Sequence, residues 1–112
     1  MKTSDTNFCL AYVTASSEAE AFRIAENSVQ DKLAACANIL PKTSSVYWWE
    51  GVVQSSEEYV VILKTTTEKF ANLEHSIKKM HSYENPCIIM LDIKDGSKQF
   101  LGWIEETINR QE

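Results

Sequence analysis

The chain has 112 residues, of which 44% are hydrophobic and 24% charged, and its 16 acidic and 11 basic side chains give a formal net charge of −5. This near-average composition excludes a disordered or collagen-like chain. It predicts one compact domain over 1–112 with an ordered core at about residues 7–110. Because a phosphate backbone attracts a basic surface, the acidic balance argues against a nucleic-acid partner.

The sequence predicts a cytoplasmic protein without a membrane partner. Residues 1–7 are polar, and no later apolar stretch approaches the ~18 residues of a membrane span. Cys9, Cys36 and Cys87 are odd in number and widely spaced, which is typical of reduced, packed thiols. A chain of this length buries roughly two-thirds of its unfolded surface, so neither a disulfide nor a metal is required for folding.

The first two predicted elements are a strand at residues 8–14 and a helix that begins after Ser17. Ser17 and Glu20 have the spacing of a capping box, in which each side chain accepts a hydrogen bond from the other residue's backbone N–H. We expect the helix to end at about Leu33. Apolar residues at three- and four-residue spacing predict its buried stripe: Ala19, Phe22, Ala25, Val29 and Leu33.

A long hairpin arm is predicted at residues 42–65, with its turn at Glu50-Gly51. The strand that precedes it, at residues 35–40, is expected to be interrupted near Pro41. The reason is that proline has no N–H to donate to a strand ladder.

A second helix follows residues 65–67, whose threonines offer hydroxyls for its N-cap. A strand at 87–93 and a helix at 97–110 complete the chain. The resulting order, β-α-β-β-α-β plus a terminal helix, predicts an α+β, ferredoxin-like sandwich with a long hairpin between its second and third strands. The second helix is expected to bury one stripe: Phe70, Leu73, Ile77 and Met80.

The strands themselves predict self-association. Segments 8–13, 59–63 and 87–91 are apolar at both odd and even positions, so both faces of the sheet should be buried. The first two helices lie on the same face in this topology, which leaves the second face without a cover. We expect another copy of the chain to cover it; the alternative is that the C-terminal helix folds back over it.

No catalytic residue is predicted. On this topology, an acylphosphatase-like enzyme would need a glycine-rich loop and an arginine after the first strand, and a soft-metal chaperone would carry Cys-x-x-Cys there. Segment 13–20 contains neither. No nucleophile stands beside a base at a motif-specific spacing, so the sequence indicates a protein that is not an enzyme.

The candidate site is the polar segment 81–86, His-Ser-Tyr-Glu-Asn-Pro. Imidazole and thioether groups are ligands for copper, and carboxylates for other divalent ions, so His81 is the predicted ligand with Met80 or Glu84 as helpers. The structural alternative is that His81 caps the preceding helix, Tyr83 packs and Glu84 pairs with a lysine.

Four segments resemble the successive signature stretches of the CutA divalent-cation tolerance family: KLAACANI at 32–39, SVYWWEG at 45–51, LKT at 63–65 and HSYENP at 81–86. The resemblance covers residues ~8–110 in the right order and spacing. It implies a ferredoxin-like subunit in a tight homotrimer, related in architecture to the PII signalling proteins, with hairpins packed across subunits. It also implies tolerance to divalent metals and binding of Cu(II) or similar ions.

The resemblance assigns seven residues to the family's inter-subunit cleft: Tyr47, Trp49, Glu50, Lys64, His81, Tyr83 and Glu84. The family's usual His-Pro-Tyr-Glu is His-Ser-Tyr-Glu here, and the Pro-Glu after it is Pro86-Cys87. Some bacterial members have Cys and His ligands where this chain has Val13 and Met80, so only His81 of that set is retained. Taken by itself, Lys64 is a strand-end charge of a kind that usually only extends to water.

The first hypothesis is therefore a non-enzymatic, cytoplasmic homotrimer that binds divalent ions, copper in particular, and contributes to divalent-cation tolerance. The alternative is a PII-like module in which Lys64, Tyr83 and Glu84 bind a small anion or metabolite in three inter-subunit clefts. A third hypothesis is a stable scaffold for other proteins.

Overall fold

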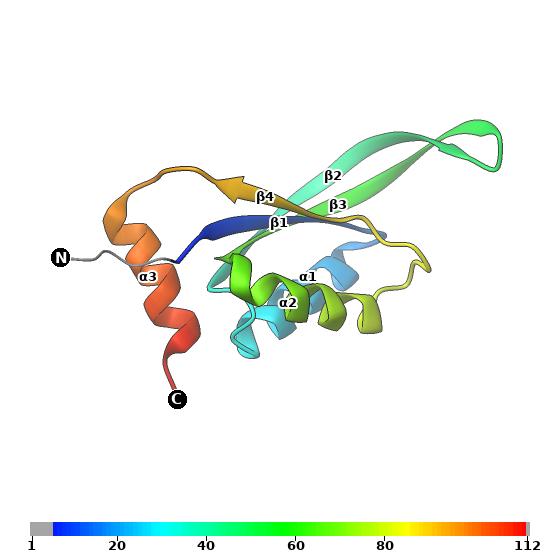
Figure 1. Cartoon of the computed structure of the whole chain (residues 1–112). Helices are drawn as coiled ribbons and strands as arrows, with labels where there is room; N and C mark the ends of the chain where they lie inside the picture. Colours follow the sequence, from blue (N-terminus) through cyan, green and yellow to red (C-terminus); the bar gives the residue numbers. More distant parts are fainter. Residues whose placement is uncertain (1–5, 112) are drawn as a thin grey trace.

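The computed structural model describes residues 6–111 (Figure 1). Its strands are β1 (Phe8–Ala15), β2 (Cys36–Trp49), β3 (Val52–Thr66) and β4 (Ile88–Ile93). Its helices are α1 (Glu18–Gln30), α2 (Thr67–Met80) and α3 (Lys98–Asn109). No helix in this part of the chain is long and apolar enough to span a membrane.

The four strands form one antiparallel sheet in the order β2-β3-β1-β4. With the helices α1 and α2 against one face, this is the predicted α+β, ferredoxin-like architecture (Figure 1). The core lies between the sheet and these two helices, and its fully buried side chains come from both layers: Ala11, Val13, Ile24, Leu63, Leu73 and Ile77. The predicted stripe of α2 is confirmed, since Phe70 and Met80 also pack against this core.

The predicted buried face of α1 is correct in part. Ala25 is buried and Leu33 packs against the core, as predicted. Phe22 is 49% exposed and Ala19 is exposed, however, and the helix buries Ala21 and Ile24 in their place. Both sets of residues have helical spacing, so periodicity alone does not choose between them. The side facing the sheet carries mostly small residues around Ile24, which lets the helix approach the sheet closely.

The helix α1 also ends earlier than predicted, at Gln30 rather than near Leu33. Lys32 has φ = 61°, the left-handed conformation that commonly terminates helices. After this residue the backbone N–H groups of Leu33 and Ala34 turn back and donate to the carbonyl of Ser28 at 2.9 and 3.2 Å.

The hairpin of β2 and β3 extends beyond the helices (Figure 1). The interruption expected near Pro41 is a shift in register between Leu40 and Thr43, and β2 continues on either side of it. An edge strand tolerates proline because one side of its ladder has no partner to lose. At the predicted turn, Glu50 and Gly51 have φ values of 50° and 80°, the pair of positive angles that a two-residue type I′ turn requires.

The sheet face opposite α1 and α2, called the open face below, is only partly covered. Tyr12 pairs with Ile62 on β3 and Ile89 on β4, and Leu10 pairs with Leu91, so these residues share that face. Ile89 and Leu91 are 53% and 47% exposed. Within residues 6–111, the helix α3 packs where β1 begins and β3 ends, through a small cluster: Phe8, Ala35, Leu101, Ile104 and Ile108. The alternative that α3 folds back over this face is therefore correct for one end of it alone, and cover of the remainder by another copy stays a prediction.

Cys9, Cys36 and Cys87 are free thiols, Cys9 being buried and the other two partly buried. Burial, and after it the charge of Asp92, raises the pKa of Cys9 to about 11. Because the thiolate is the reactive form, these surroundings make Cys9 inert. Cys87 lies just before β4 rather than within it.

Candidate functional site

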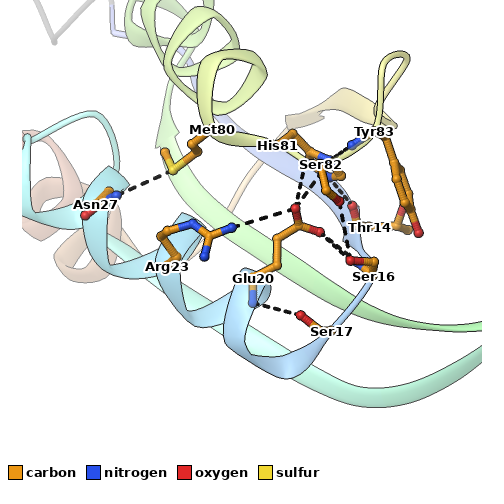
Figure 2. Close-up of polar contacts among 10 residues, drawn as sticks. All are labelled: Thr14, Ser16, Ser17, Glu20, Arg23, Asn27, Met80, His81, Ser82 and Tyr83. Atoms are coloured by element: carbon orange, nitrogen blue, oxygen red, sulfur yellow. Dashed lines mark hydrogen bonds and ion pairs between the residues drawn. The ribbon is translucent and has the colours of Figure 1, made fainter.

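The predicted site segment forms the loop between α2 and β4, and it lies against the end of β1 and the beginning of α1 (Figure 2). The residues that it contacts in space are far away in sequence: His81 contacts Thr14, and Ser82 contacts Glu20. The ferredoxin-like topology brings these segments together because β1 and β4 are adjacent strands.

Glu20 stands at the centre of this polar cluster (Figure 2). Its Oε1 accepts hydrogen bonds from the backbone N–H of Ser16 at 2.9 Å and from the Ser16 hydroxyl at 3.0 Å. Its Oε2 accepts one from the backbone N–H of Ser82 at 2.7 Å, with the Arg23 guanidinium 3.9 Å away. Glu20 is only 3% exposed, and a buried carboxylate needs hydrogen-bond donors. Each of its two oxygens has one.

This arrangement keeps Glu20 ionised. Burial on its own would raise the pKa of the carboxyl, but the hydrogen bonds from Ser16 and Ser82 outweigh it and lower the pKa from 4.5 to about 2. The predicted capping box is correct in one half only. The Ser17 hydroxyl accepts from the backbone N–H of Glu20 at 3.1 Å, whereas the Glu20 side chain binds Ser16 instead of Ser17.

The imidazole of His81 is completely buried and both of its nitrogens are engaged. Nε2 lies 2.8 Å from the carbonyl oxygen of Thr14, which can only accept, so Nε2 carries the proton. Nδ1 accepts from the backbone N–H of Tyr83 at 3.0 Å and lies 3.8 Å from Oε2 of Glu20. A metal ion could bind Nδ1 only by displacing the Tyr83 N–H.

The predicted helpers of His81 have other surroundings. The sulfur of Met80 points toward α1 and accepts from the side-chain amide of Asn27 at 3.5 Å (Figure 2). Glu84 is exposed in the loop. Within residues 6–111 no group of three or more His, Cys, Asp or Glu side chains is arranged to hold a metal. The ligand role of His81, Met80 and Glu84 therefore stays a prediction.

Tyr83 reaches from the loop to β3. Its phenol donates to Oε2 of Glu58 at 2.8 Å, and its ring lies 4.8 Å from the ring of His81, measured between centroids. Burial, the hydrogen bond to Glu58 and the charge of Glu58 raise the pKa of Tyr83, so its phenol stays protonated as a donor. Burial and the charge of Glu58 also raise the pKa of Cys87.

The other residues assigned to the cleft fall into two groups. Tyr47, Trp49 and Glu50 lie at the tip of the hairpin, where the Tyr47 hydroxyl donates to the Ser56 hydroxyl at 3.2 Å. Lys64 lies near the other end of β3, with its ammonium 2.7 Å from Oδ1 of Asn38 and 5.6 Å from the centre of the Phe100 ring.

One chain does not bring Lys64 and Tyr83 together. Tyr83 is bonded to Glu58, and six residues of extended strand, about 20 Å, separate Glu58 from Lys64 on β3. The predicted cleft therefore requires residues of more than one copy, if all of its members act on one small ligand.

Sequence reasoning missed Glu20 and Glu58, the two carboxylates that organise this cluster. Glu20 carried a local signal, its capping-box spacing from Ser17, but that signal named the wrong partner. Nothing in the sequence indicates a contact between Glu20 and Ser82, which are 62 residues apart.

The fold and the cluster define a small α+β protein of the ferredoxin-like class with a polar loop bound to the end of its first strand. The family model of the CutA1 divalent ion tolerance protein matches residues 9–107. The chain therefore belongs to the CutA1 divalent ion tolerance family.

Relatives agree with this membership. The divalent-cation tolerance protein CutA of Archaeoglobus fulgidus is 48% identical over 97 residues, covering 87% of this chain and 94% of its own. The protein of the same name from Thermus thermophilus is 39% identical over 94 residues, covering 84% and 91%. A solved structure, described as the periplasmic divalent cation tolerance protein CutA from Archaeoglobus fulgidus, has a TM-score of 0.89 at 45% identity and covers 91% of this chain and 99% of that one.

Proposed function

We propose that the chain is a non-enzymatic, homotrimeric protein that binds divalent metal ions, copper in particular, and contributes to divalent-cation tolerance in the cytoplasm. Family membership supports the role in tolerance, because its relatives are named for it. The observation that carries metal binding is the unprotonated Nδ1 of His81, 3.8 Å from the ionised carboxylate of Glu20. An imidazole lone pair beside a negative charge favours a cation.

The surroundings of His81 do not form a complete metal cage within one chain. An ion at Nδ1 would displace one backbone N–H, and its remaining ligands would be water, a rearranged side chain or a group of another copy. We expect such an ion to act as a ligand of the folded protein and not to be required for folding, since Nδ1 has a hydrogen-bond partner without it.

Calorimetric titration of Cu(II) and Zn(II) into metal-free protein tests this proposal. We expect saturable binding near one ion per chain, lost in His81→Ala. The matched control is His75→Ala, since His75 is the other histidine and is exposed on α2. Equal loss in both variants, or none in His81→Ala, would mean that any binding is a property of surface side chains and would overturn the proposal.

Two apolar surfaces support the homotrimer. The first is the open face with Ile89 and Leu91, and the second is the hairpin tip, where Trp48 is 73% exposed. Contiguous apolar patches of this kind mark interfaces, because a monomer in water gains by burying them. Sedimentation equilibrium is expected to give three times the 12.7 kDa of one chain.

The cytoplasmic location is supported by the three free thiols, which fit a reducing compartment. The Archaeoglobus relative is described as periplasmic. Fractionation of cells that produce the present chain decides between the cytoplasm and the periplasm. We expect the protein in the cytoplasmic fraction.

A second candidate function, a PII-like module that binds a small anion or metabolite, is favoured by Lys64. Lys64 is partly buried, and among the described residues its ammonium has an amide oxygen and a ring face as partners and no carboxylate within ion-pair distance. A cation in this position retains capacity for an anion. Small anions that raise the melting temperature without metal, and fail to do so in Lys64→Met, would favour this function over metal binding.

A further inference from the structure

The loop 81–87 has no regular secondary structure of its own, and its polar contacts include one to each of three different elements. The ring of His81 donates to Thr14 on β1, and the phenol of Tyr83 donates to Glu58 on β3. The third contact comes from the backbone, where the N–H of Ser82 donates to Glu20 on α1.

This third contact differs from the others because it joins the backbone of the loop to an ionised carboxylate. The carboxylate of Glu20 is buried, and Ser82 supplies the 2.7 Å hydrogen bond to its Oε2. Ser16 donates to Oε1, so losing the Ser82 N–H would weaken the hydrogen bonding of a buried charge at Oε2. The position of this N–H and the charge of Glu20 are therefore coupled. Ser82 also lies between the two residues whose orientation defines the candidate site, His81 and Tyr83.

A proline at position 82 would remove the donor of this contact, because proline has no N–H. The backbone of His81, with φ = −79° and ψ = 143°, already has the extended conformation that residues before proline adopt. The substitution Ser82→Pro is therefore compatible with the backbone of the preceding residue.

We propose that the Glu20 carboxylate and the Ser82 backbone N–H form a latch that positions the loop carrying His81 and Tyr83. Glu20 is thus a positioning residue for the candidate site. That the latch serves the candidate site rests on the proposed function. The latch holds the Tyr83 N–H against Nδ1 of His81, which is the nitrogen that a metal ion would bind. The existence of the latch does not depend on metal binding.

The test is a double-mutant cycle with amide hydrogen exchange measured by NMR. Glu20→Gln keeps the shape of the side chain but removes its charge and one acceptor oxygen. We expect exchange at the Tyr83 amide to accelerate about ten-fold or more in Glu20→Gln, in line with the loss of a hydrogen bond to a charged group. Glu26→Gln is the matched control, because Glu26 is exposed on the same helix.

Two backgrounds separate the backbone N–H of Ser82 from its hydroxyl. In Ser82→Ala, which keeps the N–H, Glu20→Gln is expected to accelerate exchange at Tyr83 as in the natural chain. In Ser82→Pro, which lacks the N–H, the same substitution should change that exchange by less than about two-fold. The Leu63 amide in the centre of the sheet reports in every variant whether the fold is intact.

Equal effects of Glu20→Gln in the Ser82→Pro and Ser82→Ala backgrounds would overturn the latch, and so would unchanged exchange at Tyr83 in Glu20→Gln itself. Titration of Cu(II) into the same variants reports separately on the proposed function. If neither the natural chain nor any variant binds the ion, metal binding fails while the exchange data still decide the latch.

Discussion

The loop cluster around Glu20 and the surface formed by the open face and hairpin tip differ in how their groups are partnered. In the loop cluster, each carboxylate oxygen of Glu20 and each ring nitrogen of His81 has a hydrogen-bond partner within one chain. On the open face and the hairpin tip, large apolar side chains such as Leu91 and Trp48 remain in contact with water.

The difference shows which parts of the molecule are complete in a single chain. The loop cluster needs nothing further to be stable, so its polar groups set the shape of the site. The apolar surfaces, and the ammonium of Lys64 at the far end of β3, are the parts that another molecule would complete.

Placing a charge on the open face should have the largest effect. In Leu91→Asp, association would bury a carboxylate without a partner, so we expect the assembly to dissociate to 12.7 kDa chains. Sedimentation equilibrium measures this mass. The control Asp92→Asn changes a charge at the neighbouring exposed position and should leave the assembly intact. A Leu91→Asp protein of unchanged mass would show that the open face is not the interface.

Acid should remove the stabilisation contributed by Glu20. Its pKa is about 2 in the folded protein against 4.5 ordinarily, so the contribution is fully present above pH 4.5 and is lost as the pH falls toward 2. At neutral pH it amounts to about 3 kcal/mol at most. Urea unfolding at several pH values between 2.5 and 6 measures how steeply the free energy of unfolding falls as the pH falls.

The free energy of unfolding should depend less steeply on pH in Glu20→Gln than in the natural chain over this interval. Glu26→Gln should show the same pH dependence as the natural chain. Parallel curves for the natural chain and Glu20→Gln would show that the Glu20 carboxyl titrates alike in the folded and unfolded states.

Removing the hydroxyl of Tyr83 should have a smaller effect on the stability of the same cluster. Tyr83→Phe leaves the largely buried Glu58 without its 2.8 Å donor, which we expect to cost about 1–2 kcal/mol in the free energy of unfolding. Tyr59→Phe on the same region of β3 is the matched control and should change stability by less than about 0.5 kcal/mol. If the two variants lose the same stability, the hydrogen bond to Glu58 makes no net contribution to the free energy of unfolding.

Lys64→Met should have the smallest effect on stability. It removes one hydrogen bond to Asn38 and a contact with the Phe100 ring, both near the surface, so we expect a change of about 0.5–1 kcal/mol. Lys42→Met, at an exposed position of the hairpin, is the control. A loss of more than about 2 kcal/mol in the free energy of unfolding would show that Lys64 stabilises the single chain and is not held available for a binding partner.

Sequence patterns predicted best where one local rule acted alone. Glu50-Gly51 formed the predicted turn because a type I′ turn, with a positive φ angle at both central residues, matches the twist of the two flanking strands. The stripe of α2 around Leu73 and Ile77 was also correct. The stripe of α1 was correct at Ala25 but wrong at Ala19 and Phe22, because two helix faces met the same periodicity and packing against the sheet selected the one with Ile24.

The site was predicted less completely than the fold. His81 and Tyr83 were predicted as members of the candidate site, but the carboxylates that accept hydrogen bonds from Ser82 and Tyr83, Glu20 and Glu58, were not. Each of these carboxylates lies on an element distant in sequence from the loop, so no spacing rule connects it to its donor.

By itself, the sequence determined the order of elements, the turn and the two-sided apolar strands, because these depend on residues close together in the chain. Tertiary structure decided which face of α1 is buried, which tautomer His81 adopts and why Glu20 stays charged. Each of these outcomes depends on burial and on hydrogen-bond partners that only the folded chain supplies.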